Sequence, residues 1–288
     1  ETNIPDRIHQ GLCVFDYMED HRTAMKYRSE DLPFIVRNRP EILGTVNKWH
    51  QDGYIAKMLD DPTRTYLMHA SETPNFLYWD MTREEYPDNY VPPSTTQRIT
   101  YPEYLKLAAT FNETSKHYYL FVEGFWSTSD LNFRWYMFDE FPMFKPKNVD
   151  MFNEVVHIDY QKLHCKFHNN QKGAHAVMHF DSGSNLIVLL QGQRRILLAD
   201  PTQCSKLELH RAGHPSVRHT TLDFDNLDPS STLMFNEVVT QPGDALYIPS
   251  YWFHDLTSLS DDVAQCGAWS TATMNHKPII QQCGHFGL

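Results

Sequence analysis

The sequence predicts a mainly β fold with flanking helices, in which an N-terminal α/β extension wraps a jelly roll of antiparallel strands. From about residue 155, short apolar segments alternate with turn clusters at near-regular spacing. Before that point, helical and strand-like segments are mixed. Of the 288 residues, 41% are hydrophobic, which is enough for one large core. We therefore expect one domain over 1–288, with an extension at 1–154, a core at 155–275 and a tail at 276–288.

The extension contains recognisable helices and strands. Three residues mark the start of one helix: Thr100 can cap it, Pro102 suits its first turn, and Glu103 completes a capping box with Thr100. Apolar spacing predicts one uninterrupted helix over 42–59, and β-branched or aromatic runs predict strands. The remaining expected elements are a helix at 16–26, strands at 32–37, 65–69 and 118–122, and a long surface excursion at 72–98.

In the core, apolar runs bounded by turn residues predict the strands. The turn Gln241-Pro242-Gly243-Asp244 has proline and glycine where a type II turn requires them. Residues 200–230 form a polar insertion, and its three histidines are expected in a solvated loop, with a second metal site as the alternative: His210, His214 and His219. The expected strands are Val155–Ile158, Ala176–Phe180, Leu186–Leu190, Arg195–Ala199, Ser231–Phe235, Ala245–Pro249 and Ala264–Trp269.

Composition restricts the partners. The formal net charge is -11, so the surface repels phosphate backbones and nucleic acid is not expected as a partner. No apolar stretch approaches the length of a transmembrane helix, so no membrane partner is expected either. The oligomeric state has no signature in the sequence.

The cysteines and a glycosylation sequon bear on the cellular compartment. The five cysteines include no CxxC pair, and their odd number leaves at least one thiol unpaired: Cys13, Cys165, Cys204, Cys266 and Cys283. The chain begins without Met, and Asn112-Glu113-Thr114 is a glycosylation sequon. An intracellular location is slightly favoured, and the secretory pathway or the extracellular space is the alternative.

A possible metal site stands out in the core. His179 and Asp181 are two positions apart at the end of an expected strand, so their side chains point to the same face. His254 follows a hydrophobic strand and can supply a third ligand. Two imidazoles and one carboxylate form the facial triad of non-haem iron(II) oxygenases, which leaves coordination positions open.

A second His-x-Asp sequence, His157-Ile158-Asp159, is interpreted as a chance occurrence. It lacks the downstream asparagine, the Gly-x-Arg strand and the spacing to a third histidine. A motif indicates function only when the surrounding structure fits.

With these residues in place, the chain resembles the JmjC (jumonji C), cupin-like family of 2-oxoglutarate oxygenases. His254 lies 73 positions after Asp181 and follows a Pro-Gly-Asp-x-Leu-Tyr-Ile-Pro segment. The run Leu190-Gln191-Gly192-Gln193-Arg194-Arg195-Ile196 also matches the family. The resemblance covers roughly 31–270, most strongly 176–270. It implies a double-stranded β-helix core, Fe(II) as the metal, and 2-oxoglutarate and O₂ as cosubstrates.

The resemblance also implies roles for three more residues. Arg194 occupies the position of the basic residue that binds the distal carboxylate of 2-oxoglutarate, and Arg is suited to a bidentate pair. Tyr119 matches a hydroxyl that shares this carboxylate, and Asn185 matches a polar position beside the cosubstrate. Many relatives have a threonine three residues before the first ligand, whereas this chain has Ala176.

Two neighbouring residues receive structural interpretations. Arg195 points to the opposite face from Arg194 and is expected in an ion pair. Asp255 is expected to accept a hydrogen bond from a metal ligand.

The predicted function is an Fe(II)- and 2-oxoglutarate-dependent dioxygenase that hydroxylates a protein or peptide side chain. Two alternatives remain open. The first is a JmjC-like metalloenzyme that uses another metal or no 2-oxoglutarate, which Ala176 suggests. The second is a non-catalytic, metal-binding cupin module.

Overall fold

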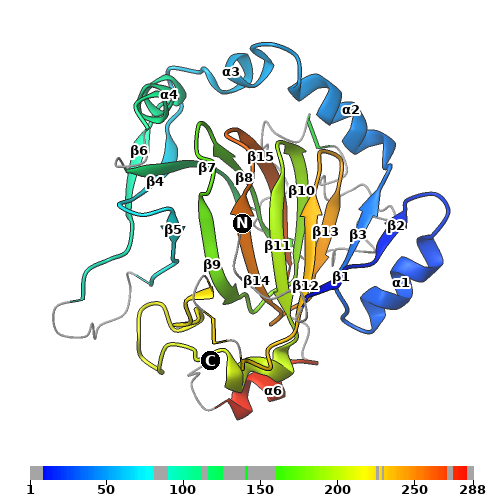
Figure 1. Cartoon of the computed structure of the whole chain (residues 1–288). Coiled ribbons are helices and arrows are strands. Elements are labelled where there is room, and N and C mark those ends of the chain that lie inside the picture. Colours follow the sequence, from blue (N-terminus) through cyan, green and yellow to red (C-terminus); the bar gives the residue numbers. More distant parts are fainter. Residues whose placement is uncertain are drawn as a thin grey trace.

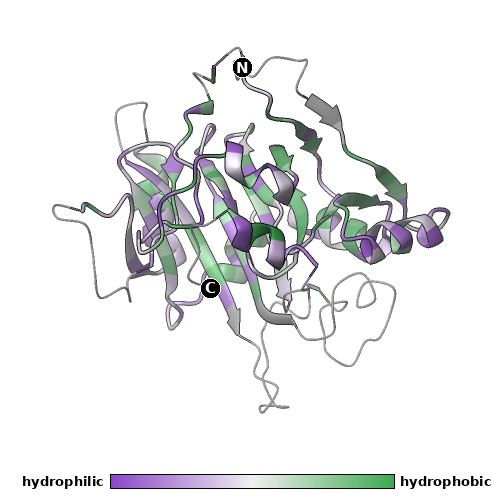
Figure 2. Ribbon diagram, turned by 90° about the horizontal axis from the view of Figure 1, so that it is seen from below, coloured by the Kyte–Doolittle hydropathy of each residue, from purple (hydrophilic) through white to green (hydrophobic). Residues whose placement is uncertain are grey.

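The fold is mainly β, as the sequence predicts, and two mixed sheets face each other around a shared interior (Figure 1). The computed structural model describes residues 9–80, 90–111, 116–125, 140–141, 160–224, 227–228, 230–270 and 275–283. Hydrophobic colour runs along the central strands, and the outer helices show both hydrophilic and hydrophobic colour (Figure 2). No helix in these residues is both long and apolar enough to cross a membrane.

The smaller sheet carries two of the three candidate metal ligands, His179 and His254. Its strand order is β1-β12-β11-β14-β9-β5. The three middle pairings are antiparallel, and the edge strands β1 and β5 pair in parallel. The bounds are β1 His9–Gly11, β12 Phe235–Thr240, β11 Arg194–Ala199, β14 Phe253–Ser258, β9 His175–Phe180 and β5 Asn75–Phe76.

The larger sheet joins the two halves of the chain. Its order is β2-β3-β13-β10-β15-β8-β7-β4-β6, so strands of the N-terminal extension continue both edges of the core sheet. The bounds are β2 Val14–Asp16, β3 Phe34–Arg37, β13 Ala245–Ile248, β10 Asn185–Gln191, β15 Val263–Ser270, β8 Tyr160–His168, β7 His117–Phe125, β4 Tyr66–Ser71 and β6 Thr95–Ile99.

Apolar side chains fill both sides of the larger sheet near β13 and β10. The interior cluster joins the two sheets through Ile35, Leu246 and Ile248 on one side and Ile196, Leu198 and Leu256 on the other. A larger outer cluster packs the helices against the sheet. Those helices are α1 His21–Ser29, α2 Pro40–Trp49, α3 Tyr54–Leu59 and α4 Tyr101–Ala109.

The N-terminal predictions are mostly confirmed, with three corrections. The helix expected at 16–26 begins only at His21 and runs to Ser29 as α1, and Asp16 belongs to β2. Thr100 and Glu103 form the expected capping box at the start of α4. The expected single helix over 42–59 is instead α2 and α3, because Gly53 adopts a left-handed conformation with φ of 70° that interrupts the helix. The expected excursion at 72–98 contains β5 and β6, whose pairing partners lie elsewhere in the chain.

Several core strands differ from expectation. β8 and β14 were not predicted, because polar and charged side chains interrupt their apolar pattern. The strand expected at 231–235 begins only at Phe235 and runs on as β12. The strand expected at Val155–Ile158 lies outside the described residues, as do the sequon at Asn112 and the second His-x-Asp sequence.

The 200–230 insertion is anchored on the smaller sheet. It begins with the 3₁₀ helix η4, Pro201–Lys206, which a disulfide between Cys204 and Cys283 joins to the end of α6, Lys277–Gln282. A second disulfide joins Cys165 on β8 to Cys266 on β15, which are paired in register. The fifth cysteine, Cys13, is free and exposed.

Candidate metal centre

The sheet register brings the three predicted ligands together. His179 lies on β9 and His254 on β14, and these two residues are directly paired. Asp181 follows the last residue of β9, two positions after His179, which directs both side chains to the barrel interior. The backbone N–H of Tyr251 donates to the carbonyl of Asp181 at 2.8 Å and fixes the chain at this point.

The ligand atoms of the three residues form one compact group. One ligand atom from each of the three residues lies within 4.8 Å of the others, and no other such group occurs in the described part of the chain. His254 Nε2 is 3.6 Å from Asp181 Oδ2, and the two imidazole centroids are 4.3 Å apart. Metal–ligand bonds of about 2.1 Å place two ligand atoms at most about 4.2 Å apart, so the His254–Asp181 distance fits an ion.

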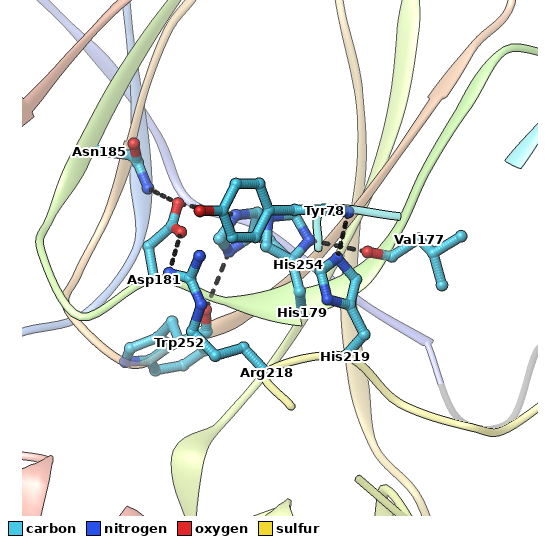
Figure 3. Close-up of polar contacts among 9 residues, drawn as sticks. All are labelled: Tyr78, Val177, His179, Asp181, Asn185, Arg218, His219, Trp252 and His254. Carbon is cyan, nitrogen blue, oxygen red and sulfur yellow. Dashed lines mark hydrogen bonds and ion pairs between the residues drawn. The ribbon is translucent and has the colours of Figure 1, made fainter. Parts of the chain in front are cut away.

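Backbone carbonyls orient both imidazoles (Figure 3). His179 Nδ1 lies 2.7 Å from the carbonyl of Val177, and His254 Nδ1 lies 2.9 Å from that of Trp252. Each Nδ1 therefore carries the proton, and each Nε2 lone pair faces the centre. Burial is the main reason that the pKa of both histidines is lowered, which keeps the rings neutral and able to bind a metal.

Asp181 is held by two side chains, one on each oxygen. Asn185 Nδ2 donates to Oδ2 at 2.9 Å, and Arg218 Nη1 donates to Oδ1 at 3.1 Å. Burial alone would raise the pKa of Asp181, but His179, His254 and Arg218 together lower it below the usual range. The carboxylate is therefore ionised at neutral pH, as a metal ligand must be.

The insertion contributes residues to this centre that the sequence analysis did not assign. The stretch around His219 forms a β-bridge with His179, and Thr220 N–H donates to the Met178 carbonyl. This pairing places Arg218 beside Asp181 and stacks the His219 ring on His179 at 4.8 Å. The Tyr78 ring, on the loop after β5, lies beside Arg218, whose guanidinium carbon is 5.0 Å from the ring centre (Figure 3).

The expectation of a solvated loop for the insertion histidines is therefore wrong for His219, which is 1% exposed. His210 and His214 are half-buried and stack on each other at 4.0 Å. Polar composition does not indicate exposure here, because the loop pairs with the edge of β9 instead of extending into solvent. No local pattern distinguishes His219 from its two neighbours.

The three residues assigned to the cosubstrate lie in different surroundings. Asn185 binds the carboxylate of Asp181, as described above. Arg194 is 2% exposed and donates to Gln265 and to the carbonyl of Leu256. Burial lowers the pKa of Arg194 to about 10, so the guanidinium stays charged at neutral pH. Tyr119 is half-buried, and burial raises the pKa of its hydroxyl, which remains protonated.

The two neighbouring residues have clear partners. Arg195 forms the expected ion pair, with Glu237 on β12. Asp255 accepts from His175 Nε2 at 2.6 Å, so its observed partner is a histidine outside the proposed ligand set. The orienting acceptors of the two ligand imidazoles are instead the backbone carbonyls.

Comparison with known proteins gives a consistent result. A model of the family described as "Cupin-like domain" matches residues 21–275. The chain is 34% identical over 87 residues to "tRNA wybutosine-synthesizing protein 4" of Gibberella zeae, which covers 29% of this chain and 8% of that protein. It is 32% identical over 91 residues to "Jumonji C domain-containing protein 5" of Drosophila melanogaster, which covers 30% of this chain and 22% of that protein.

A third relative is "Lysine-specific demethylase JMJ31" of Arabidopsis thaliana, which is 25% identical over 119 residues. That match covers 39% of this chain and 22% of the relative. The aligned regions thus span less than a quarter of each of these three proteins. The family match covers most of the chain and agrees with the two facing sheets and the His-Asp-His group between them. The chain belongs to the JmjC-like cupin domain family.

Proposed function

We propose that this protein is an Fe(II)- and 2-oxoglutarate-dependent dioxygenase. The observation that carries the proposal is the buried group of His179, Asp181 and His254, with both Nε2 atoms and one carboxylate within reach of a single cation. Three protein ligands leave coordination positions for a bidentate cosubstrate and O₂. Iron(II), with 2-oxoglutarate and O₂, supplies an oxidation that inserts one oxygen atom into a C–H bond and yields succinate and CO₂.

The protein's own residues have three tasks in this scheme. The Val177 and Trp252 carbonyls keep each imidazole in the tautomer that binds a metal through Nε2. Arg218 and Asn185 occupy the outer lone pairs of Asp181, so the carboxylate keeps one orientation. The Tyr78 ring packs against Arg218 and the His219 ring stacks on His179, so both side chains support residues of the centre.

We propose a protein or peptide side chain as the substrate. The relative named as a lysine-specific demethylase is consistent with that class. Relatives named as tRNA wybutosine-synthesizing proteins favour a tRNA substrate instead. The net charge of -11 weighs against nucleic acid, because a tRNA backbone would be repelled. Two disulfides among the described residues favour an oxidising compartment.

A specific observation supports one second candidate, a metalloenzyme of this family that does not use 2-oxoglutarate. Ala176 lies opposite Leu256 and offers no side-chain donor. Arg194, the assigned carboxylate ligand, already donates to Gln265 and Leu256. Two of the three donors expected from the family are therefore missing or engaged.

The direct test measures succinate formation by the full chain with Fe(II), 2-oxoglutarate and O₂. Many such enzymes turn over their cosubstrate slowly without substrate, so wild-type protein is expected to release succinate even alone. A mixture of basic and neutral peptides serves as the first substrate set, with mass analysis for a gain of one oxygen. Bound iron without any 2-oxoglutarate binding or succinate would support the second candidate and contradict the first.

A further inference from the structure

Strand β8 directs two basic side chains into the interior of the barrel. Leu163, Cys165 and Phe167 on this strand belong to the outer apolar cluster. Because side chains alternate along a strand, Lys166 and His168 point to the opposite, interior face. Neither is an assigned metal or cosubstrate residue. His168 is 4% exposed, and its Nδ1 has no hydrogen-bond partner in the described structure.

The register of the larger sheet aligns these residues with neighbours on both sides. Lys166 is paired with Gln265 on β15 and with Phe121 on β7, three strands that lie side by side in Figure 1. Tyr119, two positions before Phe121 on the same face, stacks on His168 at 5.3 Å. The Lys166 ammonium lies 5.8 Å from the centre of the Tyr119 ring, within the range of a cation–π contact.

Arg194 reaches the same place from the smaller sheet. Its Nη1 donates at 2.6 Å to Gln265, the residue directly opposite Lys166. Its Nε–H is buried without a partner in the described structure. A buried donor without an acceptor costs roughly 1–3 kcal/mol, so this group indicates a place where a ligand supplies the acceptor.

The charges in this cluster agree with its geometry. Burial, then Arg194 and Lys166, hold the pKa of His168 well below its usual value. The ring is therefore neutral at physiological pH and sits close to two cations. A neutral imidazole can still donate one N–H to an anion, so the cluster can offer an anion both charge and directed donors.

We propose that Lys166 and His168 complete, with Arg194 and Tyr119, a two-cation pocket for the distal carboxylate of the 2-oxo dicarboxylate cosubstrate. This inference rests on the proposed function. It assigns cosubstrate binding to strand β8, where the family resemblance assigned nothing. It also explains how the chain accommodates Ala176, since β8 replaces the missing threonine donor with an ammonium and an imidazole. Two cations, one of them buried, favour a dicarboxylate over a 2-oxo acid with one carboxylate.

The test is calorimetric binding of 2-oxoglutarate and 2-oxobutyrate to the full chain loaded with Mn(II), which avoids turnover. Lys166→Met is expected to weaken 2-oxoglutarate binding at least tenfold, or about 1.4 kcal/mol, and 2-oxobutyrate binding less than threefold. Lys166→Arg should retain most of the affinity, and His168→Phe should weaken it severalfold. Lys172→Met, at an exposed position four residues after the end of β8, is the charge-matched control and should change neither constant.

The outcomes separate this inference from the proposed function. Unchanged 2-oxoglutarate affinity in Lys166→Met and His168→Phe, with normal Mn(II) content, overturns the role of β8 and leaves the dioxygenase proposal standing. Equal losses for both 2-oxo acids also overturn it, because they indicate a general defect. Failure of wild-type Mn(II) protein to bind 2-oxoglutarate overturns both.

Discussion

The interior of the barrel has two contrasting halves. Near β13 and β3 it is entirely apolar, and seven buried side chains from the two sheets meet there. Near β8 and β7 the same sheet presents imidazoles, rings, an ammonium and an amide to the interior. The apolar half consists of Ile35, Ile196, Leu198, Leu246, Ile248, Trp252 and Leu256. The polar half includes Tyr119, His164, Lys166, His168 and Gln265.

This contrast separates stability from function. Burying apolar area stabilises the fold by about 25 cal/mol per Å², whereas buried polar groups stabilise it only when they are fully paired. Two disulfides lie in the outer apolar clusters, next to the elements that carry the polar side chains. The Cys165–Cys266 disulfide joins the two strands that carry Lys166 and Gln265, and the Cys204–Cys283 disulfide holds the insertion that carries Arg218.

The largest expected effect is the loss of activity in Asp181→Ala. Removing the carboxylate leaves two imidazoles and an unpaired Arg218, so metal is lost and succinate formation should fall at least about 10³-fold. Metal content after dialysis and the far-UV spectrum check that the ion is lost while the fold survives. Asp159→Ala, in the second His-x-Asp sequence, is the matched control. Comparable loss in the control, or activity retained in Asp181→Ala, would remove the assigned centre.

The next largest effect is expected in the apolar half. Leu246→Ala leaves a cavity between the sheets and should lower the free energy of unfolding by about 2–5 kcal/mol. Its Mn(II) content should stay unchanged, because Leu246 belongs to the apolar cluster and not to the metal site. Urea unfolding measures the first quantity and metal analysis the second. Val239→Ala, at a 44% exposed position, should cost less than about 0.5 kcal/mol. Joint loss of metal and stability would show that the halves are not separable.

The sequence predicted the apolar half better than the polar half. The strand around Leu246 and the strand Phe34–Arg37 are continuous apolar runs, so local pattern suffices to find them. The convergence of the three candidate ligands was also predicted, because His179 and Asp181 share a strand face and His254 follows a characteristic turn. β8 alternates polar with apolar residues, and β14 is mostly polar. The polar side chains that face the interior look, in the sequence, like residues exposed to solvent.

Other features depend on contacts that no local pattern encodes. Arg218 and His219 reach the metal centre only because their loop pairs with β9. The partner of Cys204 is 79 positions away, and cysteine spacing alone does not select Cys283. Gly53 interrupts a helix whose apolar spacing continues through it, so periodicity joined α2 and α3 into one element.

A smaller effect is expected from the disulfide that anchors the insertion. Replacing Cys204 and Cys283 together by serine frees a loop of about 79 residues in the unfolded chain and should lower the unfolding free energy by roughly 2–4 kcal/mol. Hydrogen exchange should accelerate at the Thr220 amide, which donates to the carbonyl of Met178 on β9 and so joins the insertion to the sheet. Cys13→Ser, at the free and exposed cysteine, is the control. Unchanged exchange at Thr220 would show that β9 pairing alone holds the insertion.

The smallest expected effect is a change in how stability depends on pH. The pKa of His168 is lowered well below its usual value of about 6.5, chiefly by burial. Below pH 6.5 the unfolded chain therefore binds a proton that the folded chain excludes, so this histidine reduces stability as the pH falls. His168→Phe should flatten the decline between pH 6.5 and 5 by up to about 1.4 kcal/mol per pH unit. Urea unfolding at several pH values measures the slope. Leu246→Ala should lower the whole curve without changing its slope, and an unchanged slope in His168→Phe would place that imidazole in contact with solvent.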